Sequence, residues 1–479
     1  MPHASRRNLL FLAIAVYCLL VLPRMLSHGM FLDGITYASI ARNMAENYGS
    51  FWRPYYTATV YPIFYEHPPL GFWLQSWAYR LCGDSPYVEA FWGFVVGGLI
   101  LVALGGIWQC LRPQGAAGVG TWFPLVLFMS LPMTSWAFSN NMLENTMTLF
   151  IVIAVYCCMV SLKNPHRFAS WLYGIWSGVS IFLAVLVKGP IALFPLVVPC
   201  VAMTSERQKL SQTVVTTAVL VTTLALAFGL MCSLSTASAP FFKRYVSQQV
   251  LASVTGTRET SASRFAVLKA VSRETLVPLV VAGLLTAAMY RLRKTTLAAL
   301  HSRLCWYYLG IALAGSLPIL ISIKHKRWYA FPSLPFYTLA IAVVFHDAAL
   351  ALERFLDEHK QVRTYITVLS SLMLCVAVGV MFVEKNALRR DQDFHRDFSE
   401  QPFTMGERNI ISVYPPHLAS NWSLVANMQR KFKASLSETL GHDYLLTTIE
   451  YMHSEQIPVR YTRIPPFHAK KYVLFRLDN

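Results

Sequence analysis

The stretch RRNLLFLAIAVYCLLVLP (residues 6–23) decides the fold class, because a basic pair precedes a long apolar run. A helix needs about 17–25 mainly apolar residues to cross a bilayer, and runs of that kind recur along the chain. Of the 479 residues, 55% are hydrophobic and only 14% are charged, whereas soluble domains average about 25% charged residues. Barrel strands would alternate over about 10 residues, and these runs do not alternate. The sequence therefore predicts a polytopic α-helical membrane protein.

The apolar runs predict about eleven transmembrane helices. The first follows Arg6 and Arg7, has no small-residue cleavage site after it, and is expected to keep its basic end in the cytoplasm. The predicted helices lie near residues 8–26, 88–111, 120–138, 142–162, 169–187, 190–203, 213–235, 274–291, 304–323, 329–350 and 363–384.

Two domains are expected. Residues 1–384 form the transmembrane domain, with long outer loops at 27–87 and 236–273. Residues 385–479 are polar enough for a soluble domain, and their strand-like pieces (IISVYP, KKYVLFRL) alternate with a helix-like piece (LVANMQRKF). We expect a small extracytoplasmic α/β domain there.

The segment 169–203 leaves the topology open. The apolar stretch after VKGP (Val187–Pro190) is short for a full crossing, so the segment is either a hairpin or one kinked helix. Lys and Arg are equally numerous on the two sides of the later helices, so the positive-inside tendency does not decide.

The net charge of +17 does not indicate nucleic-acid binding. Basic residues collect in membrane-protein loops and near anionic lipid, and no basic run interleaved with aromatic residues forms a platform for nucleic acid. The nine cysteines lie mostly in predicted helices, with no paired spacing typical of a disulfide framework or a metal site. No cofactor and no divalent metal is indicated.

Four stretches together resemble one family. FLDGITYASIARNMAE begins at Phe31, YEHPPLGFWLQSWAYRL at Tyr65, NNMLENTMTLF at Asn140 and LVKGPIALFPL at Leu186. In order and spacing they resemble the GT-C integral-membrane glycosyltransferases, in the branch of bacterial relatives of protein O-mannosyltransferases and of the lipid A aminoarabinose transferase. The resemblance covers roughly residues 8–350. It implies a sugar donor on a polyprenyl phosphate and transfer on the extracytoplasmic face of the bacterial inner membrane.

The resemblance assigns the catalytic carboxylate to Asp33. Transfer with inversion needs a base for the acceptor hydroxyl, and an acid at the membrane boundary can meet an acceptor that arrives from water. The alternative interpretation is that Asp33 caps the helix GITYASIARNM that follows it.

Glu66, His67 and Glu144 are further candidates. Pro68 and Pro69 fix the chain geometry after Glu66, and His67 stands where the family often has Lys. Glu144 stands where the family usually has Asp, and acids at membrane depth indicate function by default. A turn with exposed side chains, and an acid at a helix start, are the alternatives.

Cations complete the predicted site. Lys188 in VKGP matches a recurrent lysine of the family, and snorkelling to the interface is the alternative. Lys324, Lys326 and Arg327 adjoin Trp328 and Tyr329, a combination that can hold a lipid phosphate. Arg258 lies in the loop 236–273, which the resemblance implies closes over the donor; a solvated basic loop is the alternative.

The sequence thus predicts a hexosyl or pentosyl transferase whose partners are the membrane, a polyprenyl-phosphate sugar donor and a lipid, glycan or protein acceptor. One alternative is a transporter of lipid-linked sugar, which would place acids near the bilayer middle and show inverted repeats. Another is a non-catalytic assembly subunit. No repeat is visible in the sequence.

Overall fold

The computed structural model describes residues 4–111, 118–164, 166–255, 263, 265–293, 303–321, 326–399, 408–454, 457, 460–464 and 469–478. The chain divides into two compact units. The membrane unit comprises Met1–Met25, Glu66–Gly71 and Gly93–Val383. The loop unit comprises Leu26–Tyr65, Phe72–Trp92 and Glu384–Asn479, and so combines most of the long first loop with the C-terminal residues.

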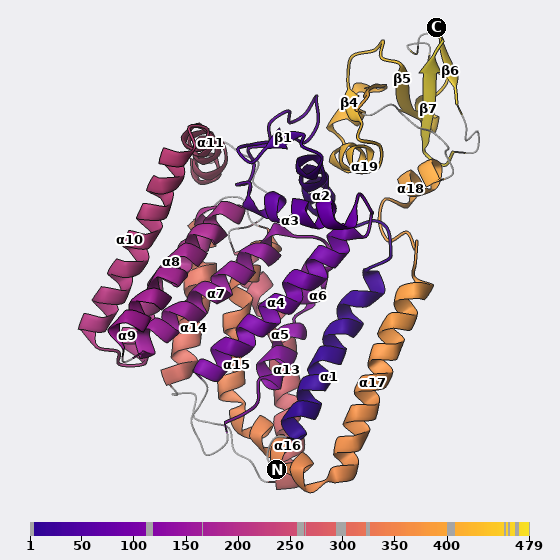
Figure 1. Cartoon of the computed structure of the whole chain (residues 1–479). Coiled ribbons are helices and arrows are strands. Elements are labelled where there is room, and N and C mark those ends of the chain that lie inside the picture. Colours follow the sequence, from indigo (N-terminus) through magenta and orange to yellow (C-terminus); the bar gives the residue numbers. More distant parts are fainter. Residues whose placement is uncertain are drawn as a thin grey trace. The chain divides into compact units, whose positions relative to one another are not determined.

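Eight helices among the described residues are long and apolar enough to cross a membrane (Figure 1). Long apolar runs adopt helices in lipid because a helix satisfies its backbone hydrogen bonds internally. The eight are α1 (Ala4–Val21, continued by η1, Leu22–Arg24), α4 (Val88–Cys110), α7 (Leu143–Lys163), α8 (Arg167–Lys188), α10 (Leu210–Leu234), α13 (Ala266–Arg293), α14 (Arg303–Ser316, continued by η4, Leu317–Ile321) and α17 (Lys360–Val383).

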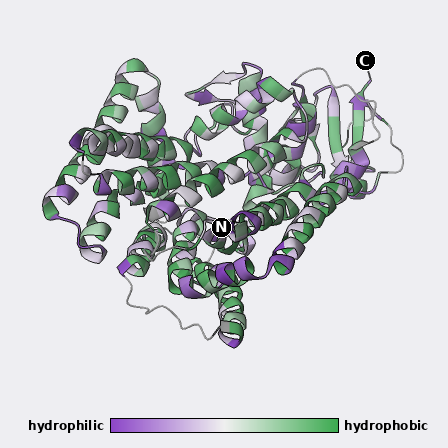
Figure 2. Ribbon diagram, turned by 60° about the horizontal axis from the view of Figure 1, so that its bottom comes forward, coloured by the Kyte–Doolittle hydropathy of each residue, from purple (hydrophilic) through white to green (hydrophobic). Residues whose placement is uncertain are grey.

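The burial of these helices separates an inner from an outer group. The most apolar stretch of α7 is 72% buried, whereas those of α10 and α17 are 11% buried and that of α13 is 17% buried. Figure 2 shows apolar residues along these helices. Since exposed apolar helix surface of this extent is typical of contact with lipid acyl chains, the chain is a multi-pass membrane protein.

Two of the predicted helices are broken. Residues 120–138 form α5 (Trp122–Met129) and α6 (Pro132–Phe138), because Pro132 has no N–H with which to continue the preceding helix. Residues 329–350 fall in η5 (Arg327–Ser333), α15 (Leu334–Val344) and α16 (His346–Glu358), with a bend of 67° before α16. The described residues hold nine candidate spans if that bent pair is one span, so the predicted number of spans is not confirmed.

The segment 169–203 forms a hairpin. Lys188, at the end of α8, contacts Glu144 at the start of α7, whereas Gln208 donates a hydrogen bond to the Leu162 carbonyl at the end of α7. Between them lie η2 (Pro190–Val197) and α9 (Val198–Ser205), each of 8 residues. With a rise of about 2.0 Å per residue in a 3₁₀-helix and 1.5 Å in an α-helix, they span about 28 Å. Because the 3₁₀-helix η2 rises more per residue than an α-helix, these 16 residues are long enough to run back to the level at which α8 begins.

Gly189 makes the turn of this hairpin. Its φ of +94° lies in the region that favours glycine, and a Cβ there would collide with the Tyr245 hydroxyl. The remaining short helices of the membrane unit are α11 (Ser238–Tyr245), the π-helix η3 (Val246–Leu251) and α12 (Ala252–Thr255).

The loop unit contains a mixed five-stranded sheet in the order β4-β3-β5-β7-β6. β3 pairs in parallel with β4 and β5, and β7 pairs antiparallel with β5 and β6. The predicted C-terminal α/β structure is thus confirmed, with the predicted strands and helix found as β3, β7 and α19. The strands are β3 (Ile410–Val413), β4 (Ser435–Ser437), β5 (Tyr444–Thr448), β6 (Tyr461–Arg463) and β7 (Tyr472–Leu477).

Helices and a small hairpin complete the loop unit. α19 begins where Asn421 accepts a hydrogen bond from the Leu424 N–H, an N-cap that its sequence favours. The other elements are α2 (Leu32–Ala45), β1 (Gly49–Ser50), β2 (Arg53–Pro54), α3 (Leu70–Cys82, mostly in this unit), α18 (Gln392–Ser399), η6 (Pro416–Ser420), α19 (Trp422–Phe432) and η7 (Ile449–Tyr451).

Candidate functional site

A buried ion pair joins two of the predicted site residues in the membrane unit. Lys188 Nζ lies 2.7 Å from Glu144 Oε1, and the side chains are 7% and 0% exposed. The antiparallel packing of α7 and α8 brings the first turn of one beside the last residue of the other, where helix dipoles favour an acid and a base respectively. Because burying two charges costs about as much as their attraction returns, stability alone does not account for the pair.

Aromatic side chains surround Lys188. Its Nζ lies 5.6 Å from the centroid of the Tyr329 ring, a cation–π contact. The Tyr245 hydroxyl donates a hydrogen bond to the Lys188 carbonyl at 3.2 Å, and burial raises the pKa of Tyr245. Tyr245 belongs to α11, so the predicted loop 236–273 contributes directly to the surroundings of the ion pair.

The predicted basic cluster stacks on two tryptophans. Trp136 and Trp328 stack with ring centroids 5.6 Å apart. The Arg327 guanidinium lies 5.2 Å from the Trp136 ring, and Lys326 Nζ lies 5.9 Å from the Trp328 ring. Arg327 is exposed, so its charge is available to a ligand. Lys324 and Arg258, the other predicted cations, lie outside the described residues.

Glu66 and His67 also belong to the membrane unit, and both are half-buried. The chain then enters α3, where a Cβ on Gly71 would collide with Leu143 and press against Val187. Those two residues immediately precede Glu144 and Lys188. The segment 66–71 therefore packs at the end of α7 and α8 that carries the ion pair, as a shared site requires.

Asp33 lies in the first turn of α2, in the loop unit, and is half-buried. The N-cap residue of α2 is Phe31, whose backbone is extended. Asp33 is therefore not the N-cap residue itself: it lies inside the first turn of α2, where the helix dipole favours a negatively charged side chain.

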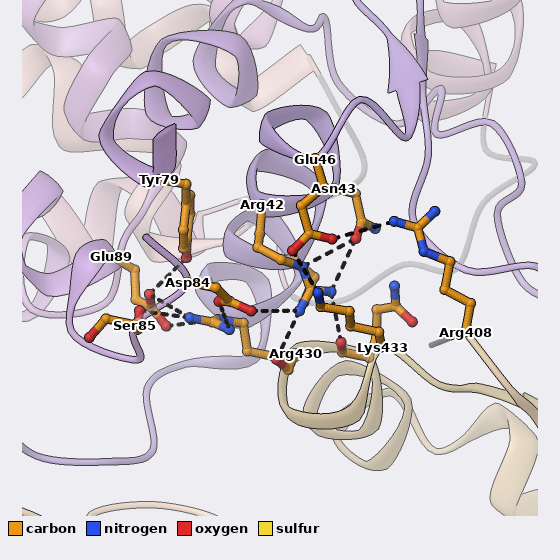
Figure 3. Close-up of polar contacts among 12 residues, drawn as sticks. Arg42, Asn43, Glu46, Tyr79, Asp84, Ser85, Glu89, Arg408, Arg430 and Lys433 are labelled. Atoms are coloured by element: carbon orange, nitrogen blue, oxygen red, sulfur yellow. Dashed lines mark hydrogen bonds and ion pairs between the residues drawn. The ribbon is translucent and has the colours of Figure 1, made fainter. Parts of the chain in front are cut away.

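Arg42, on the same helix as Asp33, is almost fully buried at 1% exposure. Its guanidinium donates to the carbonyls of Gln429 and Arg430 at 2.9 and 3.2 Å (Figure 3). Those carbonyls belong to the last turn of α19, and the Gln429 carbonyl also accepts a hydrogen bond from the N–H of Lys433, the C-cap residue, at 3.1 Å. Burial lowers the pKa of Arg42, while Asp84, 3.5 Å away, opposes that shift. Arg42 thus fastens α2 to the C-terminal end of α19.

Arg430 makes the reciprocal connection from α19 to the residues after α3. It donates to Asp84 Oδ1 at 2.7 Å, to Glu89 Oε1 at 3.2 Å and to the Ser85 carbonyl at 2.8 Å. Burial lowers its pKa, but the carboxylates of Glu89 and Asp84 outweigh burial and the net shift is upward. The Tyr79 hydroxyl donates to Glu89 Oε2 at 2.8 Å. Every charge in this group is therefore matched.

Five residues of these clusters were not predicted from the sequence: Arg42, Arg430, Trp136, Tyr245 and Glu274. Glu274, in α13, is buried and accepts a hydrogen bond from the Met133 N–H at 2.7 Å. An acid at the start of an apolar run was a usable signal for Glu274. No pattern in the sequence marks the other four, because their partners are remote along the chain. Among the described residues, no group of three or more His, Cys, Asp or Glu could hold a metal ion.

Comparison with known proteins gives partial sequence matches. Residues 66–232 match the family described as dolichyl-phosphate-mannose-protein mannosyltransferase. The chain is 25% identical over 201 residues to undecaprenyl phosphate-alpha-4-amino-4-deoxy-L-arabinose arabinosyl transferase 1 of Proteus mirabilis. That match covers 41% of this chain and 35% of the relative, so the chain spans about a third of the length of the curated relative it matches.

Solved structures match over nearly the whole chain. ArnT from Cupriavidus metallidurans, bound to undecaprenyl phosphate, has a TM-score of 0.61 at 16% identity, with 97% of each chain covered. The apo form of the same protein has a TM-score of 0.60 at 15% identity. The apo oligosaccharyltransferase of Archaeoglobus fulgidus has a TM-score of 0.50 at 13% identity, covering 93% of this chain and 70% of that one. The chain is therefore a membrane protein with the fold of the ArnT structures, and its residues 66–232 are similar to the mannosyltransferase family.

Proposed function

We propose that this protein is a glycosyltransferase that moves a hexose or pentose from a polyprenyl-phosphate carrier to a hydroxyl acceptor. The observation that carries the proposal is the buried Glu144–Lys188 pair, flanked by Tyr329 and by the basic cluster on η5. The names of the relatives support the donor class: one is an undecaprenyl phosphate-aminoarabinose transferase, and another is solved with undecaprenyl phosphate.

The cations match the leaving group of this reaction. A polyprenyl phosphate leaves with an additional negative charge, and cationic side chains aimed at that charge stabilise the transition state. Arg327 is exposed above Trp136, and Lys326 lies over Trp328. In this proposal Arg327 and Lys326 hold the phosphate, while Lys188 and Tyr329 line its inner side. His67, and Lys324 and Arg258 outside the described residues, are assigned to the same donor site.

Asp33 is assigned the role of general base, with inversion at the anomeric carbon. Its carboxylate takes the proton of the acceptor hydroxyl while the acceptor oxygen attacks the anomeric carbon. The bond from that carbon to the phosphate oxygen breaks, and its electron pair leaves with the polyprenyl phosphate. Glu66 and Glu144 are assigned to orient the donor, Glu144 through its bond to Lys188.

The proposed site faces the extracytoplasmic side of the bacterial inner membrane. Arg6 Nε contacts Glu353 Oε2 at 2.9 Å at one end of α1. Tyr17, near the other end of α1, packs against Phe138 at the end of α6, just before the start of α7 that carries Glu144. The ion pair and the basic start of α1 thus lie at opposite ends of the helices. Since Arg6 and Arg7 favour the cytoplasm, this arrangement supports an outer-side location for the pair.

The test uses the full-length protein in proteoliposomes with a panel of undecaprenyl-phosphate-linked hexoses and pentoses. Mass spectrometry follows the release of undecaprenyl phosphate, with and without a membrane extract as the source of acceptor. Consumption of one donor, dependent on Glu144 and Lys188, is the expected result. Movement of the lipid-linked sugar between leaflets without its consumption would replace the proposal with the transporter alternative.

A further inference from the structure

The loop unit contains a pocket of about 540 Å³ that the proposed reaction has not used. Its volume falls in the usual range of about 300–1,000 Å³ for small-molecule sites. Five segments line it: residues 27–30, Ile35 on α2, residues 84–89, residues 386–395 and the last turns of α19. The pocket therefore lies entirely within one unit.

Backbone hydrogen bonds fix one wall of the pocket. The His28 N–H donates to the Ala387 carbonyl, and the Arg389 N–H donates to the His28 carbonyl, each at 2.9 Å. Gly29 follows with a φ of +86°, and a Cβ there would collide with the backbone of Arg390. The segments on either side of this bridge are thus held in one arrangement without a ligand.

The polar lining offers donors and acceptors side by side. Asn386 Oδ1 accepts a hydrogen bond from the Tyr87 hydroxyl at 2.8 Å and lies 3.2 Å from His28 Nε2. The amide N–H groups of Asn386 have no partner among the described residues. His395 Nε2 is buried and has no hydrogen-bond partner in the described chain. Sugar hydroxyls, which both donate and accept, match such a mixed lining.

The charges in the pocket disfavour an anion. The guanidinium of Arg430 is already engaged by Asp84, Glu89 and the Ser85 carbonyl. Lys431 Nζ donates to the Phe398 carbonyl at 2.5 Å. The Asp84 and Glu89 carboxylates that line the pocket balance the charge of Arg430, so the lining offers an anion little net positive charge. Met30, Ile35, Pro86 and Leu388 add apolar surface, against which the C–H face of a sugar ring can pack.

Asp33 is not among the residues that line the pocket. Ile35, which does line it, follows Asp33 by two residues on α2, so at 3.6 residues per turn the two side chains leave the helix on nearly opposite sides. We propose that this pocket binds a neutral sugar ring of the acceptor. The inference rests on the proposed function, in which a hydroxyl acceptor receives the sugar, and it narrows the acceptor class to a glycan or glycolipid.

Binding is measured on the full-length protein in lipid nanodiscs, without any donor. Saturation-transfer NMR is recorded with D-glucose, D-mannose, D-galactose and N-acetyl-D-glucosamine in turn, and ³¹P line broadening with inorganic phosphate. Leu388→Trp fills the pocket, whereas Lys385→Trp places the same bulk on an exposed residue outside it. His395→Phe keeps the ring shape but removes the ring nitrogens.

At least one sugar should give saturation transfer with the wild type and with Lys385→Trp, and none with Leu388→Trp. Loss of one hydrogen bond, worth about 1 kcal/mol, should weaken binding about fivefold in His395→Phe, which tests the pocket even if Leu388→Trp does not fold. Absence of any sugar signal, an equal signal in Leu388→Trp and Lys385→Trp, or binding of phosphate alone would each overturn the inference. Failure of the proposed function appears instead in the donor-consumption assay.

Discussion

Lys188 and Glu144 form an ion pair 2.7 Å long between the last residue of α8 and the first turn of α7. Both side chains are buried, so neither charge can be removed alone without leaving the other uncompensated in a dry environment. Comparing the removal of one charge with the removal of both therefore distinguishes the contribution of the pair to stability from its contribution to catalysis.

Lys188→Met should destabilise the protein by about 3–5 kcal/mol, because it leaves the Glu144 carboxylate buried without its cation. The double variant Lys188→Met with Glu144→Leu should recover most of that stability but no donor consumption. Thermal unfolding and the donor assay, run on both variants, check the two parts. Recovery of activity along with stability would assign the pair a purely structural role.

Glu144→Gln leaves the buried Lys188 charge without its anion but keeps a hydrogen-bond acceptor, because the amide oxygen still accepts from Lys188. It should therefore destabilise the protein less than Lys188→Met does. We expect donor consumption to fall by about 10²-fold, the usual effect of losing one preorganised electrostatic group. Glu66→Gln should show a smaller decrease. Full turnover in both variants would remove these carboxylates from the proposed site.

Asp33→Asn should leave folding nearly unchanged and lower sugar transfer by about 10²–10⁴-fold, since the amide cannot act as a base. Asp393→Asn is the matched control, because Asp393 also lies in the first turn of a helix, α18, and is exposed. An Asp33→Asn enzyme that retains more than about a tenth of wild-type transfer would contradict the base assignment.

Arg430→Met should loosen the loop unit, because it removes the cation paired with the buried Glu89 carboxylate and leaves Asp84 with Arg42 alone as its arginine partner. Breaking a buried pair costs about 3–5 kcal/mol, and the loss should appear as faster amide hydrogen exchange in α2 and α19. Arg476→Met, which removes an exposed arginine from β7, is the control. Unchanged exchange in α2 would show that Arg430 does not support the helix that carries Asp33.

His395 should make the loop unit sensitive to acid. Burial, His28 and Lys431 lower its pKa from 6.5 to about 4. The unfolded chain therefore binds a proton that the folded chain excludes, and stability present above pH 6.5 is lost as the pH falls toward 4. The loss is at most about 3 kcal/mol. His395→Phe should flatten the dependence of the melting temperature on pH across this window, and an unchanged slope would contradict the assignment.

Hydropathy predicted most of the spans because each depends on one uninterrupted segment. Pro132 is visible in the sequence as a helix breaker, but the predicted helix 120–138 runs through it. This is one reason why more spans were predicted than the described residues contain. The hairpin at Gly189 could not be decided, because the 3₁₀ geometry of η2 supplies a length that residue counting does not show. Motif position predicted Glu144 and Lys188, but their pairing depends on how α7 packs against α8.

The arginine contacts of the loop unit were beyond prediction for a different reason. Arg42 and Gln429 are separated by 387 residues, and their bond depends on a side chain meeting a helix end. No periodicity or local sequence motif predicts a contact of this kind. The same holds for the pocket, whose walls come from segments at both ends of the chain.

The composition of the loop unit has a consequence for biosynthesis. Its segments are Leu26–Tyr65 and Phe72–Trp92 near the start of the chain and Glu384–Asn479 at its end. Arg42 is therefore synthesised long before its hydrogen-bond acceptors, because the carbonyls of Gln429 and Arg430 are translated hundreds of residues later. Nascent chains lack the clamp on the helix that carries Asp33 until translation finishes, so a stalled or truncated product would insert its spans without acquiring the completed loop unit.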